Sequence, residues 1–128
     1  LFERNYTDGI LNGLSKEYDE KGRILNEWTY ENGRLEGTAK EFSDDGNVRF
    51  ERNFHQDQVH GLVREYDASG KLIRTFEYKN GQQNGITKEF YENGKIKAEF
   101  NYKDGKLVSS NQYDREGNVI HSGPLDSQ

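Results

Sequence analysis

The stretch EFYENGKIKAEFNYKDGK, residues 89–106, contains two glycine turns with a strand between them. Along residues 96–102 apolar or small side chains alternate with polar ones, and a period of two indicates a β-strand with one buried face. Gly94 and Gly105 stand where a tight hairpin needs a positive φ. The stretch therefore predicts a β-hairpin unit.

The same unit recurs along the chain with a period of 24 residues, marked by Tyr6, Tyr30, Phe54, Tyr78 and Tyr102. The turn glycines follow the same period, except that Asp57 replaces one of them. In the last unit Tyr113 comes one residue early, so one residue has been lost after Tyr102. Such a period predicts one supersecondary unit used about five times over residues 1–122, with residues 123–128 as a C-terminal tail.

The predicted fold class is all-β: an elongated antiparallel β-meander of repeated hairpins in a single-layer twisted sheet. Loops such as DDGN, residues 44–47, should place Phe42 opposite Val48. The other connection, YENGRLEG at residues 30–37, fits either a two-residue Asn-Gly hairpin with a bulge at Gly37 or a longer connector. We favour the connector, because simple hairpin pairing would put Phe42 on the face opposite Tyr30.

Composition narrows the function classes. Acidic and basic residues are interspersed and the net charge is -5, which disfavours nucleic acid as a partner, since phosphate binding would call for a basic stripe. No apolar run could span a bilayer, no signal-peptide pattern is present, and cysteine is absent. The chain starts inside a repeat, so we expect a trimmed piece of a longer protein. The compartment stays open between cytoplasm and cell envelope or secretion, with a slight preference for the envelope.

The skeleton of residues 89–106 and of FEYKNGQQNG, residues 76–85, resembles the variant MORN repeat of bacterial proteins, which include the YwqK-like antitoxin family. The resemblance extends over roughly residues 2–121. It implies an array of β-hairpins that serves as an interaction or structural module without catalytic residues, and antitoxins or immunity proteins occur among its members. Classical MORN strands carry a glycine where Asn26, Arg52 or Phe76 stands here, so lipid binding is not implied.

The groups that could carry chemistry are better explained by structure. His55, His60 and His121 lack the spacing of a metal site, and the turn residues 44–47 lack a calcium ligand set. Four carboxylates recur with the repeat and are expected to form a charged ladder about 10 Å apart, too far for paired acid/base catalysis: Glu17, Glu41, Glu65 and Glu89. We predict no enzyme activity, no cofactor and no metal.

A stripe of aromatic residues remains as the candidate binding surface, because a single-layer sheet cannot bury its whole apolar face. Arg52 interrupts the stripe where other units carry an aromatic ring, and Arg74 stands where another unit has Phe50. The predicted partner-binding residues are Arg52, Arg74, Trp28, Tyr30, Phe54 and Tyr78.

These observations together predict a non-enzymatic bacterial repeat scaffold for protein–protein interaction, toxin-neutralising or associated with the cell envelope. The alternatives are a structural spacer that associates with itself through its edge strands, and a carbohydrate-binding surface protein.

Overall fold

The computed structural model describes residues 1–124, and these residues form only strands, turns and loops. The strands are β1 (Phe2–Glu3), β2 (Tyr6–Thr7), β3 (Ile10–Leu11), β4 (Gly13–Tyr18), β5 (Ile24–Glu31), β6 (Arg34–Leu35), β7 (Gly37–Phe42), β8 (Val48–His55), β9 (Gln58–Val59), β10 (Gly61–Tyr66), β11 (Leu72–Lys79), β12 (Gln82–Gln83), β13 (Gly85–Phe90), β14 (Ile96–Lys103), β15 (Lys106–Tyr113) and β16 (Val119–Pro124).

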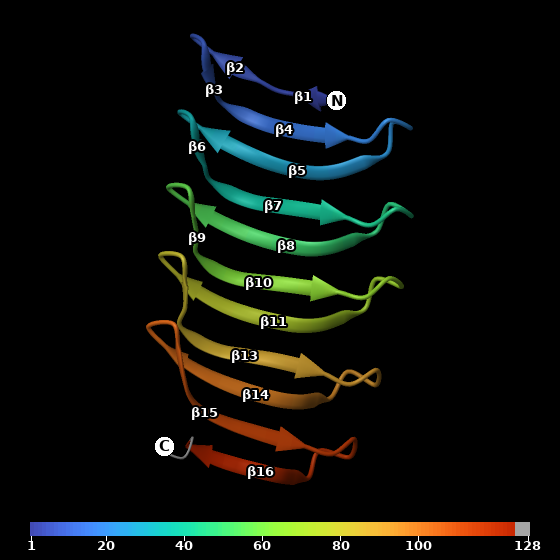
Figure 1. Cartoon of the computed structure of the whole chain (residues 1–128), viewed down its shortest axis with the longest axis vertical. Helices are drawn as coiled ribbons and strands as arrows, with labels where there is room; N and C mark the ends of the chain where they lie inside the picture. Colours follow the sequence, from blue (N-terminus) through green and yellow to red (C-terminus); the bar gives the residue numbers. More distant parts are fainter. Residues whose placement is uncertain (125–128) are drawn as a thin grey trace.

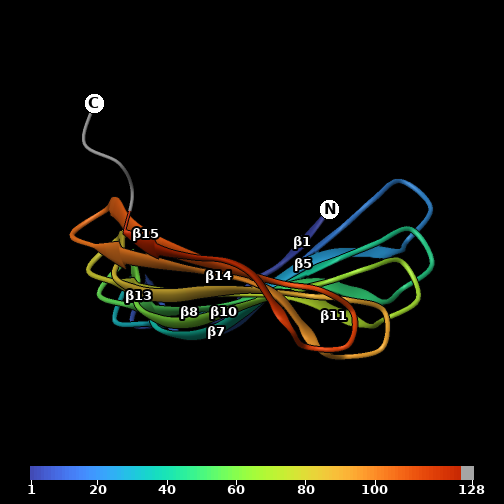
Figure 2. The ribbon, with the colours of Figure 1, turned by 90° about the horizontal axis from the view of Figure 1, so that it is seen from below.

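Most of these strands lie side by side in one antiparallel sheet, in the order β1-β4-β5-β7-β8-β10-β11-β13-β14-β15-β16. The short strands β6, β9 and β12 pair with the ends of β5, β8 and β11 and form hairpin tips, and β2 pairs with β3 separately. Figure 1 shows the resulting column of hairpins, which runs from β1 at one end to β16 at the other. Seen along the column, the hairpins superimpose as one curved and twisted layer (Figure 2). The predicted elongated antiparallel β-meander is confirmed.

Loops of one kind join the longer strands at one end of the sheet. In the loop between β7 and β8 the N–H of Ser43 donates to the carbonyl oxygen of Asn47 at 2.8 Å, and the N–H of Gly46 donates back to that of Ser43 at 3.0 Å. This loop places Phe42 opposite Val48, as predicted. The equivalent loops repeat the pairing in the next two units.

Two-residue turns form the hairpin tips at the other end. Asn32 and Gly33 have φ angles of 51° and 83°, and Tyr30 pairs opposite Leu35. Between this pair and the pair Glu27–Lys40, residues 28–29 of β5 face residues 36–39, so the returning chain carries extra residues around Gly37. The favoured long connector is therefore wrong. A tight hairpin forms with an irregularity at Gly37. The irregularity adds an even number of residues, so Phe42 does lie on the face opposite Tyr30, and the expectation that one face buries both rings is wrong.

Each hairpin tip is bonded to the tip of the preceding repeat through the backbone. The second turn residue donates its N–H to a carbonyl oxygen of the previous tip: Gly33 to Leu11, Asp57 to Leu35, Gly81 to Val59 and Gly105 to Gln83, at 2.8–3.0 Å. These bonds couple neighbouring repeats outside the sheet ladder. They explain why the period of 24 residues is held so strictly in the turns.

The fifth repeat shows where its missing residue was lost. Asn101 pairs with Ser109 and Tyr102 with Leu107, so a single extra residue, Val108, replaces the larger irregularity of the other repeats, and β15 runs unbroken. At the end of the chain β16 continues through Gly123 to Pro124, opposite Ser110 and Ser109. The paired strand thus extends two residues past the predicted boundary at 122, and residues 125–128 of the predicted tail lie outside the described residues.

The buried residues of this layer are small. Val63 and Ala98 are 5% and 4% exposed, and the buried polar side chains are those of Ser15, Thr75, Thr87 and Ser110. The large rings of the sheet are only half-buried. Rings that cover small residues while staying partly exposed leave an apolar surface open for binding.

Candidate functional site

The strand register sorts the side chains onto two faces. One face, called the charged face, carries a row in which bases of one strand mostly pair opposite acids of the next: Lys16, Glu27, Lys40, Glu51, Arg64, Thr75, Lys88, Glu99 and Asn111. Opposite charges at directly paired positions stabilise a sheet. The other face, called the aromatic face, carries the aromatic stripe that includes Trp28, Tyr30 and Phe54, and also the recurring carboxylates. Further rings lie on the charged face, where the hydroxyls of Tyr18 and Tyr113 donate hydrogen bonds to Glu3 and Glu99.

The recurring glutamates do not lie next to one another in an unbroken row of carboxylates. On the aromatic face their row reads Glu17, Asn26, Glu41, Phe50, Glu65, Arg74, Glu89, Ala98 and Gln112 across successive strands. Each glutamate is therefore separated from the next by one intervening strand, which agrees with the predicted spacing. The residue on that intervening strand differs in every repeat and decides whether the carboxylates are paired.

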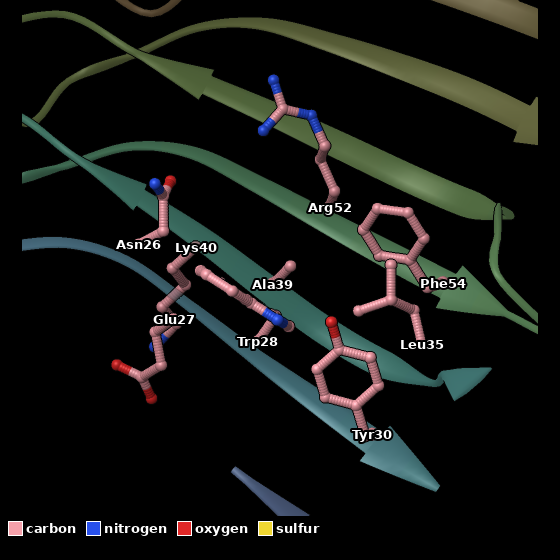
Figure 3. A pocket seen from close by; sticks show the side chains of 9 residues that line it. All are labelled: Asn26, Glu27, Trp28, Tyr30, Leu35, Ala39, Lys40, Arg52 and Phe54. Carbon is pink, nitrogen blue, oxygen red and sulfur yellow. The ribbon is translucent and has the colours of Figure 1, made fainter. Parts of the chain in front are cut away.

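A hollow of about 240 Å³ opens on the aromatic face across the second repeat (Figure 3). Trp28 and Tyr30 of β5, Leu35 of β6, and Arg52 and Phe54 of β8 surround it. Asn26, Glu27, Ala39 and Lys40 complete its lining. Figure 3 shows the ring of Trp28 and the side chain of Arg52 on separate strands, with Ala39 between them.

The hollow exists because two neighbouring strands depart from the repeat at the same place. Position 39 belongs to a row of small residues whose other members are buried: Ser15, Val63, Thr87 and Ser110 are 1%, 5%, 7% and 8% exposed. Ala39 alone in this row is half-exposed. Arg52 pairs opposite Ala39, where the buried Val63 and Thr87 have Phe76 and Phe100 opposite them. A small residue without a covering ring leaves space above it.

Arg52 is held on one side and open on the other. Its guanidinium lies 4.7 Å from the centre of the Phe50 ring, and its Nη1 atom is 3.3 Å from Oε2 of Glu41. The Arg52 side chain remains 35% exposed. A guanidinium has five N–H donors, so one long contact to a carboxylate leaves most of them for water or a ligand.

Arg74 is in a different position, although the sequence suggests the same role. Its Nε atom lies 2.8 Å from Oε2 of Glu89 and its Nη1 atom 2.9 Å from Oε1 of Glu65. These two hydrogen bonds, first that of Glu89 and then that of Glu65, raise the pKa of Arg74 above its ordinary value. Arg74 therefore bridges two glutamates of neighbouring strands.

Of the six predicted site residues, the structure brings four together: Trp28, Tyr30, Arg52 and Phe54 line the hollow. Arg74 and Tyr78 lie one repeat further along, on the same face. Sequence reasoning missed the other five lining residues, among them Leu35 and Ala39. The signal for Ala39 was available, because it is the smallest residue in a column that otherwise holds Ser15, Val63 and Thr87.

Two of the three histidines meet at a hairpin tip. The ring centroids of His55 and His60 are 6.0 Å apart, and Nδ1 of His55 lies 3.2 Å from Oε1 of Glu36. In the described part of the chain, no three His, Cys, Asp or Glu residues are grouped so that they could hold a metal ion. Residues 1–124 also contain no helix of the length and apolar character needed to cross a membrane.

Comparison with known proteins identifies the repeat. The family model for the MORN repeat variant matches residues 11–32, 35–56, 59–80 and 83–104. No curated protein matches the chain significantly. Among solved structures, a mutant of S. aureus TarM in complex with fondaparinux, alpha-GlcNAc-glycerol and UDP is similar, with a TM-score of 0.52 and 15% identity. The match covers 75% of this chain but 19% of that one, and at this identity it shows a shared fold alone.

Proposed function

The chain belongs to the family of MORN repeat variants and is a repeat scaffold; from this premise we propose that it is non-enzymatic and binds a protein partner on its aromatic face. The observation that supports this proposal is the hollow across β5–β8, where half-exposed rings and a partly free arginine occur together. Trp, Tyr and Arg are the side chains that most often dominate the affinity of protein interfaces. The proposed contact residues are those predicted: Arg52, Arg74, Trp28, Tyr30, Phe54 and Tyr78.

Half-exposed rings are suited to this role because they are already ordered. The rings of Trp28 and Phe54 are fixed on paired strands of the sheet, so binding orders few additional rotamers. A partner that covers them removes apolar surface from water, at roughly 25 cal/mol per Å². Arg52 lies beside these rings, and its directional hydrogen-bond donors can fix the orientation of the partner.

The resemblance to YwqK-like antitoxins makes a bacterial toxin the first class of partner to test, and an envelope protein the second. Affinity capture from bacterial extracts should compare the wild-type chain with two matched variants: Arg52→Ala in the hollow and Arg64→Ala on the charged face. We expect the wild-type chain and Arg64→Ala to capture a partner that Arg52→Ala does not capture. The purified partner should also bind the purified wild-type chain. A partner retained equally by both variants would refute the assignment to the aromatic face.

A second candidate function is self-association through a sheet edge. On the path through the sheet β16 has one neighbour, β15, and Val119 and Ile120 of β16 are 62% and 64% exposed. Exposed edge strands with apolar side chains pair readily with other chains. A mass that rises with concentration in light scattering, and that falls to the monomer with Ile120→Lys, would support this candidate. A monomer at all concentrations would exclude it.

A further inference from the structure

We propose that the hollow takes two neighbouring side chains of a partner protein: an apolar one against its rings and an acidic one against Arg52. This inference rests on the proposed function and names the chemistry that the partner presents. It is carried by three features of the hollow, namely its local charge, its apolar wall and the distance between the two.

The charged side chain that the aromatic face presents to the hollow is basic, although the chain as a whole is acidic. The formal net charge of the protein is -5, yet the charged residues that line the hollow are two bases and one acid: Arg52, Lys40 and Glu27. Lys40 and Glu27 pair opposite each other in the row of the charged face, so Arg52 is the charged side chain that the aromatic face presents to the hollow. A carboxylate is the protein group that complements a guanidinium with free donors.

The two arginines of the aromatic face differ in how firmly neighbouring carboxylates hold them. Arg74 meets two carboxylates at 2.8 Å and 2.9 Å, whereas Arg52 meets one at 3.3 Å. Glu41, the partner of Arg52, is itself 46% exposed, so this pair is weakly held and a second carboxylate can join it. Stacking on Phe50 keeps the guanidinium plane in place in the absence of a ligand.

The apolar wall lies on the other side of Ala39. Trp28, Tyr30, Leu35 and Phe54 supply it, and the hollow of about 240 Å³ has room for one large apolar side chain beside a carboxylate. Because Ala39 lacks the bulk of Val63 or Thr87, a partner side chain can rest on it. This partner side chain would cover Ala39 as Phe76 and Phe100 cover the equivalent residues in the later repeats.

The distance between the two parts favours two separate side chains over a single residue. Trp28 and Arg52 stand on β5 and β8 with β7 between them, which separates their backbones by roughly 9.6 Å. Side chains at positions i and i+2 of an extended peptide lie about 7 Å apart on one face, and their flexible ends can close the remainder. The ring and the terminal carboxylate of one C-terminal residue share a single Cα and span less.

The experiment uses the only tryptophan of the chain, Trp28, as a reporter inside the hollow. The indole N–H resonance of the full chain is followed by NMR during titration with the amidated tripeptide acetyl-Phe-Ala-Glu-amide. Its matched controls replace Glu by Gln or by Lys. Acetyl-Phe-Ala with a free carboxylate represents a chain end, and methyl glucoside represents a carbohydrate.

We expect a saturable shift of the Trp28 indole resonance with the Glu peptide and a dissociation constant about tenfold higher with the Gln peptide. A concentration of 1 M NaCl should reduce this difference. In Arg52→Gln the Glu and Gln peptides should bind alike, while Arg64→Gln on the charged face should keep the difference. Cross-peaks of residues far from the hollow report that each variant is folded. Equal affinity of the Glu, Gln and Lys peptides, or tighter binding of the chain-end or sugar probe, would overturn the inference.

A second measurement covers the case in which short peptides bind too weakly. A library of random peptides is selected on the wild-type chain and counter-selected on Arg52→Gln, and an acidic residue within two positions of an aromatic or aliphatic one should be enriched. If the captured partner shifts the Trp28 signal and the library shows no acidic enrichment, the inference fails and the proposed function stands. If no partner is captured and neither peptides nor library respond, both fail.

Discussion

The carboxylate of Asp57 accepts a hydrogen bond from the backbone N–H of Leu35, one repeat earlier, with 2.7 Å between Oδ1 and the nitrogen. The N–H of Asp57 returns a bond of 3.0 Å to the carbonyl oxygen of Leu35. Asp57 has a φ of 67° at a turn position that is glycine in Gly33 and Gly81. A side chain in this left-handed region costs roughly 1–2 kcal/mol. The additional bond to the previous tip offsets this cost, so the substitution of glycine is tolerated.

Removing this bond while keeping a Cβ at position 57 should therefore destabilise the array more than restoring glycine does. We expect Asp57→Ala to lower the free energy of unfolding by about 1 kcal/mol more than Asp57→Gly, which loses the bond but relieves the backbone. Urea unfolding followed by circular dichroism measures the difference. Asp44→Ala in an exposed loop is the control and should change little. Equal losses in the two Asp57 variants would contradict the explanation.

Arg74 should be a structural residue to a degree that Arg64 is not. Arg74→Gln leaves the carboxylates of Glu65 and Glu89 without their shared partner, and Glu65 is only 15% exposed. We expect a loss of about 1 kcal/mol in low salt that shrinks in 1 M NaCl. Arg64→Gln gives up a single contact of 3.8 Å to Glu51 and should lose less. Equal losses for the two arginines would show that the two short contacts of Arg74 add no stability.

The outcome at the two kinds of turn shows how far sequence reasoning reaches. The pairing of Phe42 with Val48 could be predicted, because the loop length and its glycine set the register between them. The tip at Asn32 and Gly33 had its signs in the sequence, an Asn-Gly pair and a glycine at position 37. It was rejected on the assumption that Phe42 and Tyr30 share a face, whereas the sheet carries rings on both faces. A bond from the N–H of Glu36 to the carbonyl of Thr29 at 3.0 Å fixes the irregularity after the tip.

The candidate site was predictable in its residue types and not in its shape. Trp28 was identified as a member of an aromatic stripe and Arg52 as an interruption of it, and the structure places both at one hollow. The hollow itself arises from Ala39 standing opposite Arg52, which is a property of two strands in register. The contrast between Arg52 and Arg74 likewise depends on distances to glutamates on neighbouring strands, and the sequence alone suggests the same role for both arginines.

Three loops begin with an aspartate that accepts backbone N–H bonds from residues two and four positions later, at 2.8–3.0 Å. Hydrogen bonds hold the pKa of each carboxyl below its ordinary value of 3.8. The main donor is the N–H of Arg23 for Asp19, the hydroxyl of Ser69 for Asp67 and the N–H of Asn118 for Asp114.

These loops should make the array sensitive to acid. Because the pKa is lower in the folded state than in the unfolded state, the stabilisation is complete above about pH 5 and is lost as the pH falls through the folded values. The urea midpoint should therefore drop between pH 5 and pH 2. In a variant with serine at positions 19, 67 and 114, the urea midpoint should be lower at pH 5 and should drop less toward pH 2. Serine is the residue that the equivalent loop carries at Ser43. The same drop in the variant as in the wild type would exclude the loops as its cause.

Filling the hollow should separate stability from binding. Ala39→Val introduces the side chain that is 5% exposed at the equivalent Val63, and burying its added carbons should raise the free energy of unfolding by about 1 kcal/mol. The same substitution removes the space for a partner side chain and should weaken binding of the acidic tripeptide about tenfold. Thr38→Val, one residue earlier on the charged face, is the control: it loses a hydrogen bond of 3.1 Å to Asn53 and should gain no stability. Urea unfolding and the Trp28 indole signal measure the two effects on the same samples. A more stable Ala39→Val chain that binds the tripeptide as the wild type does would show that the hollow is an ordinary packing defect.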